Sequence, residues 1–332
     1  MTDFVHVPNP TGLPGLKTAA LLMLAIAIGA TVGLTDPDLG HTLSQGIDMT
    51  LLTLVGLLFF EIRLKFLSKA LANLRFIGIA WVANFVIVPV IGYAIASLFL
   101  SEQPLLFAGV LIYFLAPCTD WFLAFTRMAR GDTALGAALM PINMLTQLML
   151  LPLWLWLVTT GSGLVDLATI PDVMLQWFIV PLLVAQAARW ASSRVFPAAT
   201  FDKVCDVVGI LLTEVTAALV LQLFAAHPPV IAENYEMFGF VLLAIFVFFL
   251  VTYVMGEGLS WGFGLSYPEQ VLLSMTTAAR NAPLMLAVTA VVIPDQPIIY
   301  AALVIGMLVE FPHLTALKQA LLARAARQGM TG

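Results

Sequence analysis

The stretch Leu115–Asp132, with the sequence LAPCTDWFLAFTRMARGD, places polar residues inside a long apolar run. Pro117–Asp120 interrupts the hydrophobic residues, and Arg127 and Arg130 close the run. Proline has no backbone N–H, so it kinks or breaks a helix. A break inside a membrane frees backbone groups that lipid cannot satisfy. The stretch therefore predicts a helix that is broken near the middle of a bilayer, where its polar groups meet a solute or an ion.

The composition of the whole chain is that of a membrane protein with many spans. The chain has 332 residues, of which 61% are hydrophobic and 10% charged, whereas soluble domains carry about 25% charged residues. Its 14 basic and 19 acidic residues give no basic surface for a nucleic acid, and the lipid bilayer is the expected partner. Two cysteines do not make a disulfide scaffold. No ATP-binding GxxxxGK[ST] motif, nucleophile–base pair or metal-ligand spacing is present, so we expect no enzyme activity, cofactor or metal.

Hydrophobic segments recur along the whole chain, many of them near the length of about 20 residues that crosses a bilayer as a helix. We count ten: Thr18–Leu34, Ile47–Ile62, Phe76–Leu98, Leu105–Arg127, Thr133–Val158, Val173–Ala188, Val207–Phe224, Phe238–Met255, Val271–Ile293 and Ile298–Leu317. Their continuous apolar runs differ from the alternating pattern of barrel strands. The sequence therefore predicts an all-α polytopic protein with ten transmembrane helices.

Charge is distributed unequally between the connections. Basic residues follow segments two, four, six and ten: Arg63, Lys65, Lys69, Arg75, Arg127, Arg130, Arg189, Arg194, Lys203, Lys318, Arg324 and Arg327. The other connections are acidic or neutral. Since Lys and Arg mark cytoplasmic connections, we expect an inner-membrane protein with both termini in the cytoplasm. Residues 1–17 would form a leader and residues 321–332 a tail.

Ten spans divide into two sets of five, residues 18–165 and 166–320, which would have opposite orientations. Inverted repeats of this kind build many secondary transporters. The motif APCTD interrupts segment four and AARNAP interrupts segment nine, which are corresponding positions in the two halves. Paired breaks in corresponding segments indicate a substrate site. The alternative is that the prolines only kink two helices, as is common in membrane proteins.

Several polar residues would lie deep in the membrane. Arg280 is about ten residues from either end of segment nine, and an arginine at a helix centre costs about 2.5–3.5 kcal/mol on insertion scales. It therefore needs partners, and Asp120 and Glu310 could form a charge cluster around it. Such a cluster is either a salt bridge that joins helices or a functional site, and intramembrane ionisable residues are functional by default. The amides of Asn143 and Gln147 would share one helix face.

Three motifs resemble the bile acid:sodium symporter superfamily, and most of all its arsenite-efflux carriers. They are CTDWFLAFTRMARGDTALGAALMPIN over Cys118–Asn143, ARNAPLMLAV over Ala279–Val288, and LVEFP over Leu308–Pro312. The resemblance implies a panel domain, made of segments one, two, six and seven, beside a core domain in which the broken segments four and nine cross. It implies a secondary transporter that works by alternating access.

The resemblance also assigns roles to residues. It makes Cys118 a ligand for arsenite, a thiophilic solute, and we expect Asp120 and Glu310 to carry protons. The further substrate-binding candidates are Thr119, Asn143, Gln147, Arg280 and Asn281, and Asn84 and Thr276 are further polar residues of the core. Thr276 and Arg280 stand where sodium-coupled relatives have Glu and Gln, which makes protons the more plausible coupling ion.

Three functions remain open on the sequence alone. The first is proton-coupled export of arsenite or a related metalloid. The second is a sodium- or proton-coupled transporter of organic anions, in which Arg280 pairs with a substrate carboxylate or sulfonate. The third is a membrane receptor or scaffold that keeps the fold without moving a solute. Substrate identity, stoichiometry, direction of transport and oligomeric state are not given by the sequence.

Overall fold

The computed structural model describes residues 14–66, 73–119, 121–159, 170–227 and 238–327, and these residues are helical with short connections. The helices are α1 (Pro14–Thr35), α2 (Pro37–Ser44), α3 (Ile47–Glu61), η1 (Leu64–Phe66), α5 (Leu74–Val82), η3 (Ala83–Ile87), α6 (Val88–Leu100), α7 (Pro104–Leu115), α8 (Trp121–Met128), α9 (Thr133–Thr159), α10 (Ile170–Met174), η4 (Leu175–Ile179), α11 (Val180–Val195), α12 (Ala198–Ala226), α14 (Phe238–Gly262), α15 (Tyr267–Ala278), α16 (Ala282–Val292) and α17 (Pro297–Arg327).

Each apolar segment predicted from the sequence coincides with one helix or with two or three consecutive helical elements. Seven of the described helices are long and apolar enough to cross a membrane, and the pair α2 and α3, bent by 44°, would make an eighth. Segments four and nine fall outside this count because each is split into two shorter helices, α7 with α8 and α15 with α16. An all-helical membrane protein is thereby confirmed.

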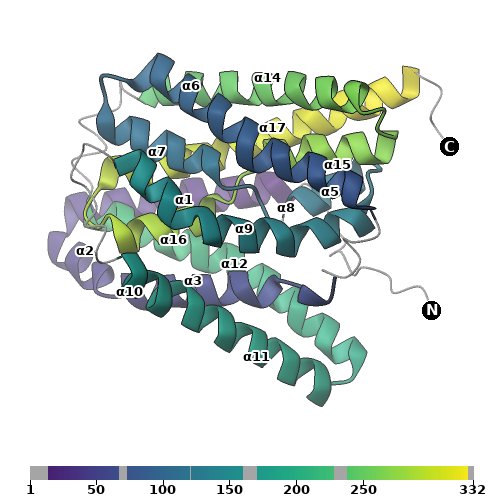
Figure 1. Ribbon diagram of the computed structural model, residues 1–332. Coiled ribbons are helices and arrows are strands. Elements are labelled where there is room, and N and C mark those ends of the chain that lie inside the picture. The colour runs from purple at the N-terminus through teal and green to yellow at the C-terminus, as the bar shows by residue number, and fades with distance from the viewer. Residues whose placement is uncertain (1–13, 67–72, 120, 160–169, 228–237, 328–332) are drawn as a thin grey trace.

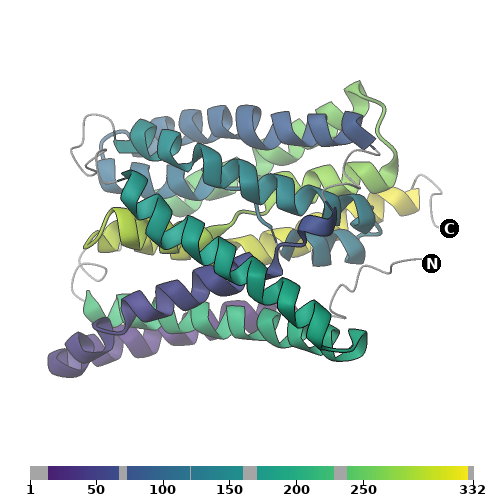
Figure 2. The same cartoon turned by 60° about the horizontal axis from the view of Figure 1, so that its bottom comes forward.

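The helices form two groups (Figures 1 and 2). One group, which we call the panel, contains α1, α2, α3, α11 and α12, and these pack mainly on one another. The other group, the core, contains α5–α9 and α14–α17, with η3 between α5 and α6. The main contacts between the groups are those of α1 with α17 and of α3 with α16.

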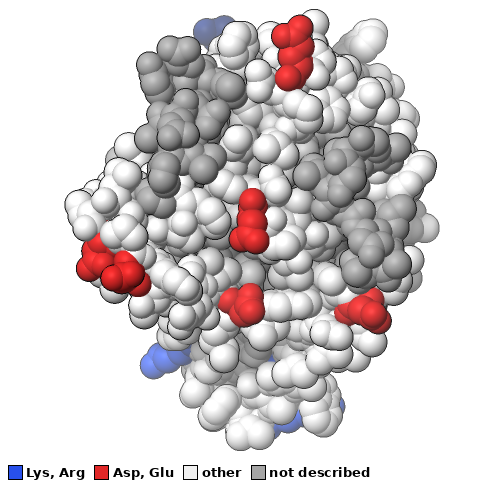
Figure 3. Space-filling view, turned by 90° about the vertical axis from the view of Figure 1, so that its left-hand side faces the viewer, with Lys and Arg blue, Asp and Glu red and all other residues white. Residues whose placement is uncertain are grey.

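The two ends of the bundle differ in charge. Figure 3 looks at the end that carries α2, where Asp and Glu side chains gather and Lys and Arg appear only near the rim. We call this the acidic end. The opposite end carries the C-termini of α3 and α17, with Arg63, Arg324 and Arg327, and we call it the basic end. This asymmetry follows the predicted alternation of connections, because the side of the bilayer that faces the cytoplasm is enriched in Lys and Arg.

Apolar packing between panel and core is also unequal along the bundle. One hydrophobic cluster joins panel residues such as Leu22, Leu54 and Leu223 to core residues such as Leu286 and Leu303. A second cluster fills the basic half of the core. The panel contributes only α1 and the η1 turn to this second cluster, with one residue each. The panel therefore packs on the core mainly through the first cluster.

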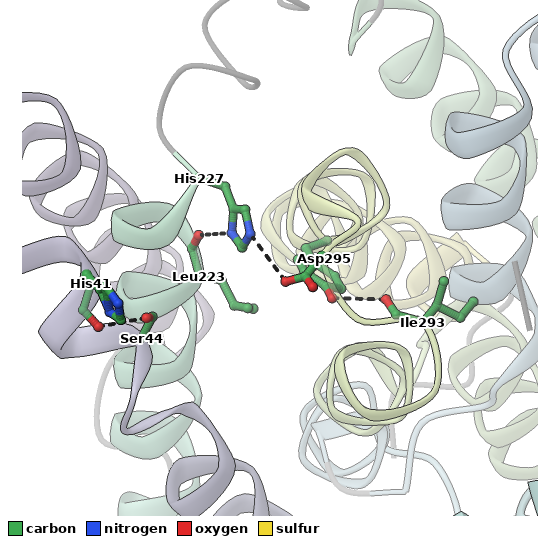
Figure 4. Close-up of polar contacts among 7 residues, drawn as sticks. His41, Ser44, Leu223, His227, Ile293 and Asp295 are labelled. Carbon is green, nitrogen blue, oxygen red and sulfur yellow. Dashed lines mark hydrogen bonds and ion pairs between the residues drawn. The ribbon is translucent and has the colours of Figure 1, made fainter. Parts of the chain in front are cut away.

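A polar contact also joins the groups at the acidic end. The imidazole Nε2 of His227, just after α12, lies 3.9 Å from the Asp295 carboxylate in the turn between α16 and α17. Figure 4 shows these two side chains facing each other across the space between a panel helix and a core hairpin. The Nδ1 atom of the same histidine lies 3.2 Å from the carbonyl of Leu223. Among the described ion pairs, this is the one between panel and core.

Candidate functional site at the crossing of two broken helices

The two helix breaks meet each other inside the core. The backbone N–H of Cys118 donates to the carbonyl of Ala279 at 3.0 Å, and the N–H of Asn281 donates to the carbonyl of Ala116 at 2.8 Å. Pro117 and Arg280 thereby form an isolated antiparallel β-bridge. Each break frees backbone groups that have no water to bind within a membrane. The bridge satisfies two of these donors and two of these acceptors at once.

Side chains reinforce this crossing. Asn281 is the N-cap of α16, and its Oδ1 accepts from the N–H of Leu284 at 3.4 Å. Its amide nitrogen donates to the hydroxyl of Thr119 at 3.2 Å, on the other break. Asn is among the preferred N-cap residues because its side-chain oxygen accepts from a free N–H of the first turn. The Asn281 side chain thus caps the N-terminus of α16 and joins it to the break in segment four.

The guanidinium of Arg280 lies at the C-terminal end of α15 and is fully buried. Its Nη2 donates to the carbonyls of Thr276 and Thr277 at 2.9 and 2.7 Å and lies 3.3 Å from Oδ1 of Asn84. Its Nη1 donates to the carbonyl of Phe114 at 3.0 Å. Helix C-termini carry free carbonyls and a partial negative charge, which favour a cation. The guanidinium therefore satisfies one carbonyl at the end of α7 and two carbonyls at the end of α15.

A hydroxyl at the centre of this site connects three helical elements. Thr276 Oγ1 accepts from Nδ2 of Asn84 at 3.1 Å and from Nδ2 of Asn143 at 3.2 Å. Asn84 lies in η3, a π-helical turn that ends shortly before Pro89. Such turns appear where the helix hydrogen-bond ladder is disturbed, and they occur frequently at functional sites. The structure thus brings Asn84, Asn143, Thr276 and Arg280 together, four of the residues singled out by the sequence.

The amides on α9 leave acceptor atoms available. Oδ1 of Asn143 and Oε1 of Gln147 are buried and have no hydrogen-bond partner among the described residues. Nε2 of Gln147 lies 2.8 Å from the sulfur of Met144, and among the described residues this side chain forms no hydrogen bond with the Arg280 network. A buried polar atom without a partner is uncommon in native structures and needs an explanation, such as a bound water or ligand.

Glu310 lies on α17 and is 2% exposed. The hydroxyl of Tyr113, on α7, donates to its Oε2 at 3.0 Å and also lies 3.1 Å from the carbonyl of Gly306. The sequence analysis did not single out Tyr113. Its position in an apolar stretch, five residues before Cys118, could have indicated it. A buried tyrosine O–H usually has a hydrogen-bond partner, so a tyrosine there points to a polar group nearby.

The predicted charge cluster has a different geometry in its described part. Arg280 has no carboxylate within ion-pair distance among the described residues, although Glu310 is close enough to interact with it electrostatically. Its charge is instead met by carbonyls and by the ring of Phe248, whose centroid lies 5.7 Å from Cζ. Asp120 lies outside the described residues, so its place in the cluster stays a prediction.

The two cysteines lie in different environments. Cys118 is fully buried at the crossing, and its backbone takes part in the bridge between the two breaks. Cys205 lies on α12 of the panel and is partly exposed. Cys118 therefore belongs to the crossing of the two breaks, and Cys205 does not.

Comparisons with known proteins identify the family. A model of the Sodium Bile acid symporter family matches residues 50–227. The Arsenical-resistance protein Acr3 of Corynebacterium glutamicum is 24% identical over 330 residues, an alignment that covers 91% of this chain and 86% of the relative. The predicted resemblance is thereby confirmed. The family that this model describes is one of symporters, a class of transporters. The chain is a transporter that belongs to the Sodium Bile acid symporter family.

Proposed function

We propose that this protein is a secondary transporter with ten spans, arranged as two inverted repeats, that exports arsenite or a related thiophilic metalloid in exchange for protons. The observation that carries the proposal is the position of Cys118. Its thiol belongs to the segment at which two broken helices are bridged, within a core that also holds Arg280 and buried amides. The arsenical-resistance relative supports the same class of substrate.

Arsenite is a small neutral trihydroxide with a soft arsenic centre, and thiolates are soft ligands. The Cys118 thiol would displace one hydroxyl group from arsenic, forming an As–S bond and releasing one water without any change in oxidation state. Hydrolysis would reverse this step. Transport requires a ligand that holds the solute weakly enough to let it leave. One thiol meets this requirement, with Thr119, Asn143, Gln147 and Asn281 as candidate hydrogen-bonding partners for the arsenic hydroxyls.

The oxygen atoms around Arg280 support proton coupling over sodium coupling. Two main-chain carbonyls and one amide oxygen converge on Nη2 at 2.7–3.3 Å. Oxygen atoms in such a cage favour hard cations such as alkali and alkaline-earth ions, and here a cation attached to the chain fills it. Sodium has no place there while the guanidinium remains. Glu310, and Asp120 by the sequence, are the groups that can bind and release a proton.

The packing supports alternating access. The panel meets the core through one shared apolar cluster and, at the acidic end, through the His227–Asp295 contact. In the basic half it adds only two residues to the core cluster. We infer that the acidic end is closed in this state and that the core rocks against the panel to expose the crossing to each side. With both termini in the cytoplasm, the basic end is the cytoplasmic one.

The test is arsenite transport by Cys118→Ser, with Cys205→Ser as the matched control. Inverted vesicles with an acidic interior should accumulate arsenite when they contain the parent protein or Cys205→Ser. The same vesicles with Cys118→Ser should lose most of the uptake. Uptake by Cys118→Ser at the parent rate would exclude a thiol-dependent mechanism.

The same vesicles distinguish the other functions. Organic-anion transport would appear as uptake of a carboxylate or sulfonate that depends on Arg280. The structure gives this function less support, because both terminal nitrogens of Arg280 already donate to acceptors of the protein. A receptor or scaffold would show no uptake of any solute, and its phenotype would survive neutralisation of Asp120 and Arg280 together.

A further inference from the structure

We propose that Tyr113 is a positioning residue that responds to the protonation state of Glu310, by turning its hydroxyl hydrogen between Glu310 and the carbonyl of Gly306. The inference rests on the proposed function, in which Glu310 carries the proton. The inference adds Tyr113, on α7, as a hydrogen-bond partner of Glu310 that responds whenever Glu310 gains or loses its proton.

The two acceptors of the hydroxyl compete for one hydrogen. Oε2 of Glu310 lies 3.0 Å from the Tyr113 oxygen and the carbonyl of Gly306 lies 3.1 Å from it. A phenol carries one donor and can also accept. When Glu310 is ionised, the hydroxyl donates to the carboxylate, and this charge-assisted bond is the stronger one. When Glu310 is protonated, its own O–H can donate to the Tyr113 oxygen, and the phenol hydrogen turns to Gly306.

The ring is held in place for this exchange. Tyr113 is 0% exposed, and a Cβ atom added to Gly306 would lie 2.8 Å from two atoms of its ring. Only glycine at that position lets the aromatic ring approach α17 so closely. Gly306 and Glu310 are four residues apart on α17, so both acceptors belong to one turn of a single helix. The hydroxyl can therefore change partners by rotation of its hydrogen, without movement of the ring.

Tyr113 also joins Glu310 to the crossing. The next residue, Phe114, offers its carbonyl to Nη1 of Arg280 at 3.0 Å. The hydroxyl on one residue and the carbonyl on its neighbour thus contact the proposed proton carrier and the fixed cation. The helix α7 ends at Leu115, one residue after Phe114. A displacement of this last turn would therefore also move the helix break.

Other ionisable groups near this pair must be considered in any pH dependence. Arg280 and Cys118 interact electrostatically with Tyr113, as Glu310 does. His313 lies three residues after Glu310 on α17, and its ring stacks on Phe249 at 3.8 Å. These groups are the same in a variant that lacks only the phenol oxygen. A change caused by that variant is therefore assigned to the hydroxyl.

The experiment compares Tyr113→Phe with Tyr300→Phe in purified protein. Tyr300 is also buried and donates to one carbonyl, that of Ile293, at 3.0 Å, without a carboxylate partner. Infrared difference spectra recorded across a pH series report the C=O stretch of the protonated Glu310 carboxyl group. The band is assigned by its loss in Glu310→Gln. This readout requires no transport.

We expect the midpoint at which the Glu310 band disappears to move upward by about one pH unit in Tyr113→Phe, because a hydrogen bond to the ionised form is lost. The midpoint in Tyr300→Phe should equal that of the parent. The ring of 3-fluorotyrosine, introduced at Tyr113, is a stronger donor and should move the midpoint downward. This third protein keeps the ring and the hydroxyl, so a folding defect cannot produce the opposite shift.

Two results would overturn the proposal, and they differ. If Tyr113→Phe has the same midpoint and band position as the parent, Tyr113 does not respond to Glu310. Proton coupling by Glu310 is then unaffected. If Glu310→Gln still exchanges protons for arsenite in vesicles, Glu310 is not the proton carrier. The role of Tyr113 in coupling then falls together with that part of the proposed function.

Discussion

Removing the fixed cation gives the sharpest test of how this site is held together. In Arg280→Ala, the carbonyls of Thr276, Thr277 and Phe114 lose their donors, and so does Oδ1 of Asn84. Each buried acceptor left unsatisfied costs about 1–3 kcal/mol. The sum over four acceptors is an upper bound, since neighbouring effects are not additive, and the variant no longer buries a charge. We therefore expect a loss of about 3 kcal/mol in the free energy of unfolding.

The same variant should respond to sodium. The alanine leaves a space next to the amide oxygen and the two carbonyls that the guanidinium nitrogen had filled. A ligand that binds only the folded state stabilises it by RT ln(1 + [L]/Kd), which is about 2.7 kcal/mol at a hundredfold excess over Kd. Sodium at high concentration should thus restore part of the lost stability of Arg280→Ala. Potassium or choline should restore less, and the parent should show no specific effect.

The assay is thermal unfolding in detergent, in sodium, potassium or choline chloride at one ionic strength. A loss of about 3 kcal/mol corresponds to roughly 4 °C in the midpoint temperature for a chain of this length. Arg194→Ala is the matched control, because Arg194 is exposed on the panel, where its guanidinium lies 5.2 Å from the ring of Trp190. Equal stability of Arg280→Ala and the parent would refute the account of the site. A sodium effect of the same size in both proteins would refute the resident-cation argument.

Two further perturbations test the packing. Gly306→Ala should lower the free energy of unfolding by about 1–2 kcal/mol, because the added Cβ would lie 2.8 Å from the Tyr113 ring. Gly258 on α14 has open space around it, so Gly258→Ala should be neutral or stabilising. Chemical denaturation of both variants checks this. Asp295→Asn should raise the fraction of molecules open at the acidic end by about 1.4- to fivefold, since exposed ion pairs contribute about 0.2–1 kcal/mol. Distances between spin labels on α12 and α17 measure this fraction, and an unchanged distribution would contradict a latch formed with His227.

The sequence predicted the elements of the fold well, because they are set by local chemistry. Long apolar runs predicted the membrane helices, and Pro117 and Pro283 indicated the two breaks. Helix ends were predicted less well. For example, α17 continues to Arg327, well beyond the predicted end at Leu317. Hydropathy ends where the bilayer ends, but this helix continues into a charged stretch in which Arg324 pairs with Glu257.

The candidate site shows where sequence reasoning stops. Unusual residues within apolar runs, such as Arg280 and Glu310, are visible in the sequence because lipid penalises them. The partners that satisfy them are ordinary groups. Carbonyls at the end of α15 and the hydroxyl of Tyr113 become partners only once two helix breaks are placed against each other. The place of Asp120 beside Arg280 stays a prediction, and helix carbonyls, which the sequence analysis did not consider, also stabilise this cation.

A tethered cation also constrains how such a transporter can be driven. A mobile sodium ion can bind on one side and leave on the other, so its gradient can do work at each cycle. The guanidinium of Arg280 fills a comparable oxygen cage but cannot leave it. It can hold the two breaks together and balance a negative charge, but it contributes the same charge on both sides of the membrane. In the proposed mechanism, the charge that changes during the cycle would come from a group that titrates, and among the described residues of the site Glu310, with Tyr113 at its Oε2, has the required chemistry.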